Sequence, residues 1–205
     1  MNRDEIINNA LKVEGWFDLD HANRLYDLAN QYVTEGGEVL EVGSWKGRSS
    51  YILAAICHDR HAHLTCMDSF AGLVVPDYSK PQEGHPRWNL YMTGNGYYHE
   101  AFEDKNFIDQ IKKNLEGFDV KFLKGDSKVL YKKIKDDSLD LCFIDGDHEH
   151  PGVDLDLKHF WPKVKKGGIF CGHDYEVGNT IEGAVTEKFG PDKVQNVRTV
   201  WSIEK

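Results

Sequence analysis

Several features that mark specialised classes of protein are missing from this 205-residue sequence. None of its four cysteines forms a Cys-x-x-Cys pair, the common pattern of zinc and disulfide frameworks. No apolar run approaches the ~18 residues that a membrane span needs. Acidic residues near the N-terminus interrupt any signal-peptide pattern. We therefore expect a cytoplasmic protein with no membrane partner, in which the cysteines are buried as small apolar residues.

An excess of basic residues is also missing. The 25 Lys and Arg residues are outnumbered by 34 Asp and Glu residues, so the formal net charge is -9. Proteins that bind the phosphates of nucleic acids usually carry a basic face, so we expect no nucleic-acid partner. Hydrophobic residues form 40% of the chain, which is typical of a protein with an apolar core. At this length we expect a single domain over residues 1–205.

The sequence does contain a regular alternation of strand-like and helix-like segments. Apolar residues recur with a helical period over residues 19–32, within an N-terminal helical segment that we place at 1–35. Short apolar runs bounded by turn residues predict strands at 38–42, 63–67, 120–123, 139–144, 168–171, 194–197 and 200–203. Further helices are predicted at 47–58, 104–115, 127–134, 153–161 and 181–189.

This alternation predicts an α/β fold. Strands that alternate with helices form a parallel sheet, so we expect a Rossmann-like, doubly wound, mostly parallel seven-stranded sheet with helices on both faces. Only Arg198 and Thr199 join the last two strands, which requires an antiparallel last strand. Residues 70–102 interrupt the pattern with three prolines and many aromatic rings, and we predict a lid or a substrate wall there.

Small and acidic residues follow five of the predicted strands at the point where each strand ends. Turns favour these residue types, so one such end would mean little. Ligands of an open α/β sheet bind beyond the carboxyl ends of its strands, so the five ends together predict a site on one edge of the sheet. The residues concerned are Gly43, Ser44, Trp45, Gly47, Asp68, Ser69, Gly125, Asp126, Ser127, Asp145, Gly146, Asp147, His148, Gly172, His173 and Asp174.

The first strand end, EVLEVGSWKGRSS at residues 38–50, is typical of an anion-binding turn. Gly43 would let the backbone approach a ligand, and Gly47 would begin a helix whose free N–H groups attract an anion. Asp68 follows Gly43 by about 25 positions, the distance at which an acid reaches a ribose diol. Trp45 replaces the middle glycine of the G-x-G-x-x-G fingerprint, which disfavours a nicotinamide cofactor.

Together these motifs resemble class I S-adenosylmethionine-dependent methyltransferases. The branch that they resemble includes the O-methyltransferases of macrolide sugars, called the macrocin type, and more distantly the catechol type. The resemblance spans roughly residues 36–204. It depends on Asp68 and on the segments EVGSWKG at 41–47, GDS at 125–127, FIDGDH at 143–148 and KGGIFCGHD at 166–174.

The resemblance implies a cofactor site for S-adenosylmethionine. Ser49 matches a family serine that binds the cofactor's carboxylate, and Asp68 would hold its ribose hydroxyls. Asp126 and Ser127 would flank the adenine. Three residues, Glu41, Gly43 and Trp45, would line the methionine part. The full set of cofactor-binding residues is expected to be Glu41, Gly43, Ser44, Trp45, Gly47, Ser49, Asp68, Ser69, Gly125, Asp126, Ser127 and Asp145.

The resemblance also implies a catalytic end of the site. Asp145 matches the first ligand of a divalent metal, and His173 and Asp174 replace the Asp-Asn pair of the catechol type as the other ligands. His148 stands where macrocin-type members also have histidine, a side chain suited to accept a proton. We therefore expect methylation of a hydroxyl on a small molecule of sugar or natural-product type, with His148 as base. Assistance by Mg²⁺ stays open, because an imidazole replaces a carboxylate at His173.

Two other functions stay open at this point. A metal-dependent hydrolase or oxygenase could use the imidazoles and carboxylates of this region. The chain could also be a non-catalytic nucleoside-binding module. A homo-oligomer is a further expectation, formed through the apolar face of the helix at 19–32. The side chains available to a hydrolase or oxygenase are Asp145, Asp147, His148, His150, His173 and Asp174.

Overall fold

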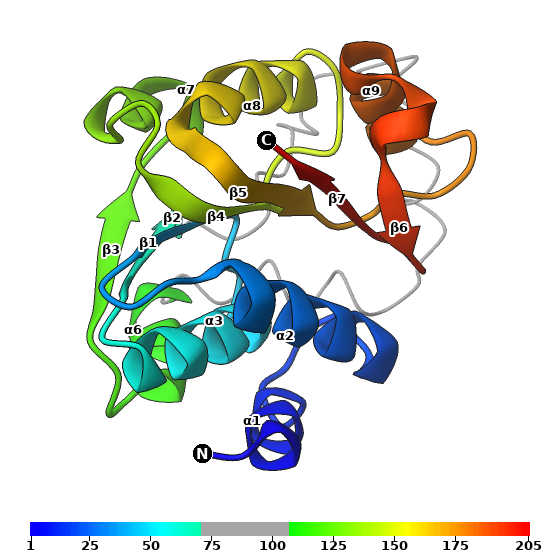
Figure 1. Cartoon of the computed structure of the whole chain (residues 1–205). Coiled ribbons are helices and arrows are strands. Elements are labelled where there is room, and N and C mark those ends of the chain that lie inside the picture. The colour runs from blue at the N-terminus through cyan, green and yellow to red at the C-terminus, as the bar shows by residue number, and fades with distance from the viewer. Residues whose placement is uncertain (71–106) are drawn as a thin grey trace, which may run out of the picture.

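A seven-stranded sheet forms the centre of the computed structural model, which describes residues 1–70 and 107–205 (Figure 1). The strands lie in the order β3-β2-β1-β4-β5-β7-β6. Except for Phe70, the predicted lid at 70–102 lies outside the described residues. The strands are β1 Glu38–Val42, β2 His63–Asp68, β3 Val120–Lys124, β4 Leu139–Ile144, β5 Val164–Gly172, β6 Gln195–Val197 and β7 Val200–Glu204.

The pairing of the strands confirms the predicted fold class. β1 pairs in parallel with β2 and β4, β2 pairs in parallel with β3, and β4 pairs in parallel with β5. β7 is antiparallel to both β5 and β6. The chain leaves β1 toward β2 and β3, then crosses to β4 on the other side of β1. The crevice between β1 and β4 is therefore a topological switch point, where ligand sites form in open α/β sheets.

Helices cover both faces of the sheet (Figure 1). One face carries α1 Arg3–Ala10, α2 Leu19–Tyr32, α3 Arg48–Asp59 and α6 Phe107–Asn114, and the other carries α7 Ser127–Leu130, α8 Gly152–Phe160 and α9 Thr180–Phe189. The helix predicted at 127–134 is shorter than expected, since the α-helical part ends at Leu130 and a 3-10 turn continues to Lys133.

The apolar face of α2 is buried inside the chain. Ala22, Leu25, Leu28 and Ala29 are at most 2% exposed and belong to the core cluster that contains the apolar residues of α3. The prediction that this face joins two subunits is therefore wrong, and a homo-oligomer stays an expectation with no surface assigned to it.

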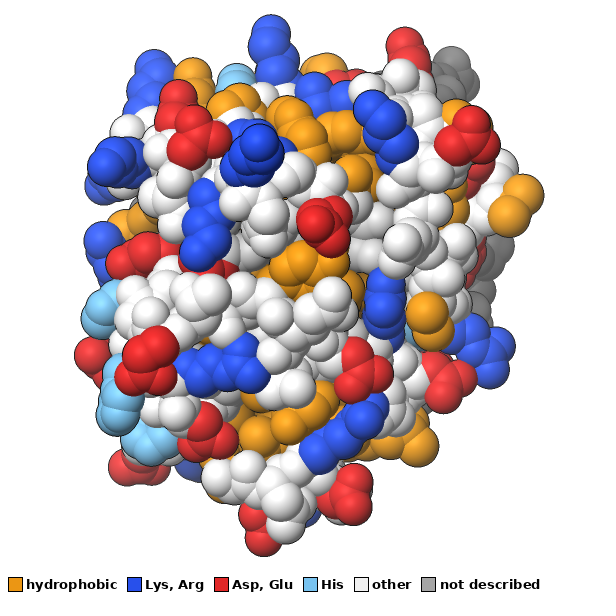
Figure 2. Space-filling model, viewed as in Figure 1, with side chains coloured by type: hydrophobic (Ala, Val, Ile, Leu, Met, Phe, Trp, Pro, Cys, Tyr) orange, Lys and Arg blue, Asp and Glu red, His pale blue; other side chains and the backbone are white. Residues whose placement is uncertain are grey.

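The remaining composition-based expectations have mixed outcomes. All four cysteines are free and buried, as predicted. Among the residues that the structure describes, none of the helices has the length and apolar character that a membrane span requires. Figure 2 shows acidic and basic side chains interspersed over the described surface of one face. The absence of a nucleic-acid partner stays a prediction.

Candidate active site

The predicted strand ends lie together at one edge of the sheet. Val42 pairs with Met67 and with Ile144, and Ile144 pairs with Gly172, so the strands end in register. Backbone hydrogen bonds continue beyond the strands: Gly43 N–H donates to the Met67 carbonyl (2.9 Å), and Asp145 N–H donates to the Val42 carbonyl (2.7 Å). The loops that follow β1, β2, β4 and β5 are thus fixed side by side.

Gly43 is required by the contact between two of these loops. Its φ is +84°, and a Cβ atom at this position would lie 2.1 Å from the Asp145 carbonyl oxygen. The close approach that we predicted at Gly43 is therefore made by the backbone after β4. This contact joins the loop that was expected to bind the cofactor to the loop that carries Asp145.

Asp68 holds the turn after β1 in place. Its Oδ2 accepts hydrogen bonds from the backbone N–H groups of Ser44 (2.7 Å) and Trp45 (3.2 Å). Its Oδ1 accepts from the Phe70 N–H at 2.7 Å and lies 3.4 Å from the Ser69 hydroxyl. These bonds connect the ends of β1 and β2, and the role of Asp68 toward a ribose stays a prediction.

Glu41 and Ser49 bond to each other within the core, and the roles predicted for them toward a cofactor stay predictions. Glu41 is fully buried, and its Oε1 accepts a hydrogen bond from the Ser49 hydroxyl at 2.6 Å. The Ser50 hydroxyl donates to Oε2. Burial raises the pKa of Glu41 to about 7, although the hydroxyl bonds oppose the rise.

The first turn of α3 has no side-chain cap. Gly47 is its N-cap residue, with φ +94°, as the glycine pattern predicted. By contrast, Asp18, Asp126 and Asn179 cap α2, α7 and α9 with their side chains. Free N–H groups at a helix N-terminus attract anions, so an anionic group can bind at the start of α3.

Trp45 lies in the turn before α3 and belongs to a row of aromatic rings. Its ring centroid is 5.0 Å from that of Trp16 and 4.7 Å from that of Phe107. Its indole N–H is buried and has no hydrogen-bond partner among the described residues. Trp45 therefore closes one side of the turn and retains a donor.

The residues that follow β3 cap the start of helix α7. Gly125 N–H donates to the Asp68 carbonyl (2.9 Å), and Asp126 Oδ1 accepts from the Lys128 N–H (2.8 Å) at the start of α7. The Ser127 hydroxyl donates to Asp156 Oδ1 at 2.6 Å. Burial raises the pKa of Asp156 to about 6, opposed by the bond from Ser127. Sequence reasoning missed Asp156, which lies within the apolar pattern of α8.

Asp145, His148 and Asp174 form a cluster that could hold a metal ion. One ligand atom from each lies within 4.8 Å of the others. His148 Nε2 is 3.6 Å from Asp145 Oδ1 and 3.2 Å from Asp174 Oδ2. Their side chains are 23%, 35% and 35% exposed, so a small molecule can reach them. We call these residues the carboxylate–imidazole cluster.

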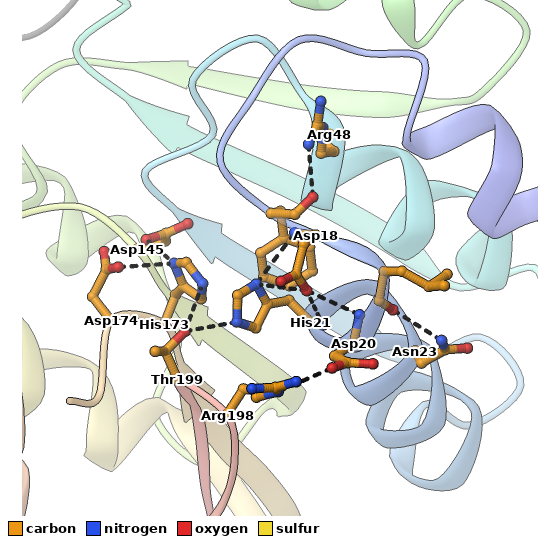
Figure 3. A network of polar contacts seen from close by, with 12 residues as sticks. Asp18, Asp20, His21, Asn23, Arg48, Asp145, His173, Asp174, Arg198 and Thr199 are labelled. Atoms are coloured by element: carbon orange, nitrogen blue, oxygen red, sulfur yellow. Dashed lines mark hydrogen bonds and ion pairs between the residues drawn. The ribbon is translucent and has the colours of Figure 1, made fainter. Parts of the chain in front are cut away.

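His173 lies beside Asp145 and Asp174, two members of this cluster (Figure 3). Its side chain is only 8% exposed, and its Nδ1 is 3.3 Å from Asp174 Oδ1 and 3.6 Å from Asp145 Oδ1. Its Nε2 is 3.0 Å from the Thr199 hydroxyl. Both ring nitrogens are thus engaged, and the group of side chains that could hold a metal contains His148 where we predicted His173.

Neighbouring charges and hydrogen bonds determine the direction in which the pKa values of His173 and Asp145 shift. Burial of the His173 ring disfavours protonation, but the negative charges of Asp145 and Asp174 outweigh it and raise its pKa to about 10. Burial would raise the pKa of Asp145, but the charge of His173 and hydrogen bonds from His148 and His173 hold it below its ordinary value. Asp145 is therefore ionised at neutral pH.

Asp147 and His150 do not join the cluster. Asp147 Oδ2 is 3.1 Å from Lys128 Nζ, and its Oδ1 accepts from the Glu149 N–H at 3.1 Å. His150 is exposed, and its Nδ1 pairs with Asp154 Oδ2 at 2.5 Å. Of the six side chains considered for a hydrolase or oxygenase, Asp147 and His150 therefore lie outside the cluster.

The N-terminal segment contributes residues that sequence reasoning missed. The ring centroid of Phe17 is 5.0 Å from that of His173, and the centroid of His21 is 4.7 Å from it. Arg48 donates to the carbonyls of Val13 (2.5 Å) and Phe17 (2.7 Å), which fastens this segment to the start of α3. The one signal in the sequence was the pair Asp18 and His21, whose spacing fits a helix N-terminus.

Comparison with known proteins agrees with this architecture. The sequence matches the protein family described as a methyltransferase domain over residues 40–175, more than half of the chain. No curated protein matches the sequence.

Solved structures of similar fold include several O-methyltransferases. The O-methyltransferase NovP is 21% identical with a TM-score of 0.67, covering 93% of this chain and 83% of that chain. CalS11, a TDP-rhamnose 3'-O-methyltransferase of calicheamicin biosynthesis, is 15% identical with a TM-score of 0.56, covering 100% and 87%. MycE of the mycinamycin pathway, solved with Mg and S-adenosylhomocysteine, is 14% identical with a TM-score of 0.59, covering 100% and 54%. At these identities the likeness is one of fold.

Proposed function

The chain belongs to the methyltransferase-domain family, and on that basis we propose that it transfers the methyl group of S-adenosylmethionine to a hydroxyl of a small molecule. One observation carries this proposal. Gly43 brings the turn before the uncapped helix α3 against the backbone of Asp145, which belongs to the carboxylate–imidazole cluster. A cofactor bound at the turn would therefore lie beside groups that can bind and deprotonate a hydroxyl.

The cofactor's carboxylate fits the first turn of α3. Because the Ser49 hydroxyl bonds to Glu41, we assign the carboxylate to the backbone N–H groups of this turn and not to the Ser49 side chain. The free indole N–H of Trp45 is a further donor on this side. We assign the ribose hydroxyls to Asp68, at the end of β2, whose carboxylate oxygens can accept further hydrogen bonds, and the adenine to the loop of Asp126 and Ser127.

Asp145 and Asp174 are the residues that would hold Mg²⁺, since this ion prefers carboxylate oxygens to imidazole nitrogens. When bound, Mg²⁺ lowers the pKa of a coordinated hydroxyl and orients it. MycE, a similar fold, was solved with Mg and S-adenosylhomocysteine, which supports this assignment.

His148 is then free to act as the base. Its Nε2 lies 3.2 Å from Asp174 Oδ2, so the carboxylate would stabilise the imidazolium that forms when the ring accepts the hydroxyl proton. The sulfonium of the cofactor is already a strong electrophile, so alignment of the acceptor oxygen with the methyl group is the main remaining requirement. The acceptor class, a sugar or natural-product hydroxyl, is supported by the fold shared with CalS11, which acts on TDP-rhamnose.

A thermal-shift screen followed by a turnover assay tests this function. We expect S-adenosylhomocysteine to raise the unfolding temperature, since ligand at 100-fold over its dissociation constant stabilises a protein by about 2.7 kcal/mol. Turnover would then be measured with S-adenosylmethionine over a panel of hydroxylated sugars, with and without Mg²⁺. Cofactor binding without turnover on any acceptor would favour a nucleoside-binding module. Stoichiometric zinc or iron, with no response to either cofactor form, would favour a hydrolase or oxygenase.

A further inference from the structure

We propose that His173 is a positioning residue, oriented by a chain of hydrogen bonds that begins in the N-terminal helix α2. The chain runs from Asp18 through His21 and Thr199 to His173, and we call it the α2 relay (Figure 3). It joins parts of the sequence that are 178 residues apart. The proposal deepens the proposed function and rests on it for the kinetic test alone.

The relay begins at the N-cap of α2. The backbone N–H of Asp18 donates to His21 Nδ1 at 3.2 Å. The Asp18 carboxylate oxygen is as close to Nδ1, but it already accepts from the backbone N–H groups of Asp20 and His21. A nitrogen that accepts a hydrogen bond carries no proton, so the proton of His21 is on Nε2. Burial of the ring and the nearby His173 lower the pKa of His21, which agrees with a neutral ring.

The Thr199 hydroxyl connects His21 to His173 through a contact with each ring. Its Oγ1 is 2.9 Å from His21 Nε2 and 3.0 Å from His173 Nε2. The hydroxyl accepts from His21 Nε2–H. Toward His173 Nε2 it donates its own proton when that ring is neutral, and it accepts a second hydrogen bond when the ring is cationic. The Thr199 carbonyl accepts from the Tyr175 N–H at 2.9 Å, which anchors the turn between β6 and β7.

The result is a fixed direction for the imidazole of His173. With Nε2 facing Thr199, Nδ1 carries a proton and faces the carboxylates of Asp145 and Asp174, whether the ring is neutral or cationic. The ring of Phe17 packs against the same imidazole. His173 therefore sets the separation and direction of the two carboxylates from behind, and neither of its nitrogens is free to bind a metal.

Substitutions at both relay residues test the proposal. Thr199→Val removes the hydroxyl at nearly constant volume, whereas Thr199→Ser keeps it. His21→Phe keeps a ring against Phe17 and His173 but removes the donor. Arg198→Gln is the control, since Arg198 lies in the same turn and its side chain pairs with exposed Asp20 at 2.9 Å, outside the hydrogen bonds of the relay.

We expect kcat to fall about 10- to 100-fold in Thr199→Val and His21→Phe, the range seen when residues behind a site are changed. The affinity for S-adenosylhomocysteine should stay the same, and Thr199→Ser and Arg198→Gln should keep the wild-type kcat. Wild-type kcat in both Thr199→Val and His21→Phe would overturn the proposal, as would an equal loss in Arg198→Gln.

Histidine side-chain ¹H–¹⁵N NMR on the wild-type chain tests the relay independently of activity. We expect the proton of His21 on Nε2, a proton on His173 Nδ1, and a changed His173 signal in Thr199→Val. A His21 proton on Nδ1, or a His173 Nδ1 without a proton, would overturn the proposal. If the wild-type chain transferred no methyl group, the proposed function would fail while these spectra still decided whether the relay exists.

Discussion

Glu41 lies in β1 and Asp145 directly follows the adjacent strand β4, yet the pKa values of their carboxyl groups shift in opposite directions. Glu41 is fully buried, and burial raises its pKa to about 7 although hydrogen bonds from neutral hydroxyls oppose the rise. Asp145 faces the charge of His173 and a bond from His148, so its pKa falls below its ordinary value. The chain thus keeps an ionised carboxylate where a metal or an imidazolium can face it, and inside the core it keeps a carboxyl group whose pKa is raised to near neutral pH.

Glu41→Gln should flatten the dependence of stability on pH. Because the folded-state pKa exceeds the ordinary value of 4.5, the folded state binds more protons between pH 4.5 and 7, and stability falls as pH rises through that window. The ionised group then costs roughly 3 kcal/mol above pH 7. Urea unfolding at pH 5 and pH 8 measures the difference, with Glu38→Gln on the exposed end of β1 as control. Parallel pH profiles for wild type and Glu41→Gln would contradict this account.

His148→Ala should lower turnover by about 10²- to 10⁴-fold, the usual contribution of a general base. The affinity for S-adenosylhomocysteine should change little, because His148 lies in the carboxylate–imidazole cluster and not in the turn before α3. His150→Ala is the matched control, since the exposed His150 pairs with Asp154 and lies outside the carboxylate–imidazole cluster. Equal losses of turnover and cofactor affinity in His148→Ala would show that His148 is structural.

The loops that follow β1 and β4 are in direct contact because Gly43 has no side chain. The turn after β1 is held from one side by Asp68 on β2 and from the other by the backbone after β4. Side-chain caps fix α2, α7 and α9, while the start of α3 is left open. The turn after β1 is thus held rigidly in place, while the backbone N–H groups at the start of α3 have no side-chain cap.

Gly43→Ala should destabilise the chain more than Gly36→Ala. Both glycines have positive φ, so each alanine carries backbone strain of about 1 kcal/mol or more. A Cβ atom at Gly43 would also lie 2.1 Å from the Asp145 carbonyl, whereas nothing lies within 4 Å of one at Gly36. Urea unfolding of the two variants isolates the contact between the loops. Equal losses of unfolding free energy would contradict a tight contact there.

The molecule as a whole shows which information the sequence carried. Strand–helix alternation was sufficient for the parallel sheet, and the parallel sheet was sufficient to bring Asp68, Asp145 and His173 to one edge. The direction of each side chain was not predictable. Which histidine joins the group of possible metal ligands, His148 or His173, depends in part on Thr199. The Thr199 hydroxyl lies in a distant turn and engages His173 Nε2.

The same limit applies to other predictions. Glu41 was expected to line the methionine part of the cofactor, and in the structure its carboxyl group accepts hydrogen bonds from hydroxyls of the following helix inside the core. The apolar stripe of α2 predicted a buried face and could not say whether the burying surface belonged to the same chain. Periodicity determines which residues share a face, whereas tertiary packing determines what covers that face.

Calorimetric titration of the wild-type chain with S-adenosylhomocysteine tests the central claim most directly. An open first turn in α3 and Asp68 at the end of β2 predict saturable, equimolar binding, tighter than that of adenosine because adenosine has no carboxylate for the N–H groups of α3. Absence of binding to pure, folded protein would contradict the account. Equal affinity for adenosine would contradict the assignment of the carboxylate to α3.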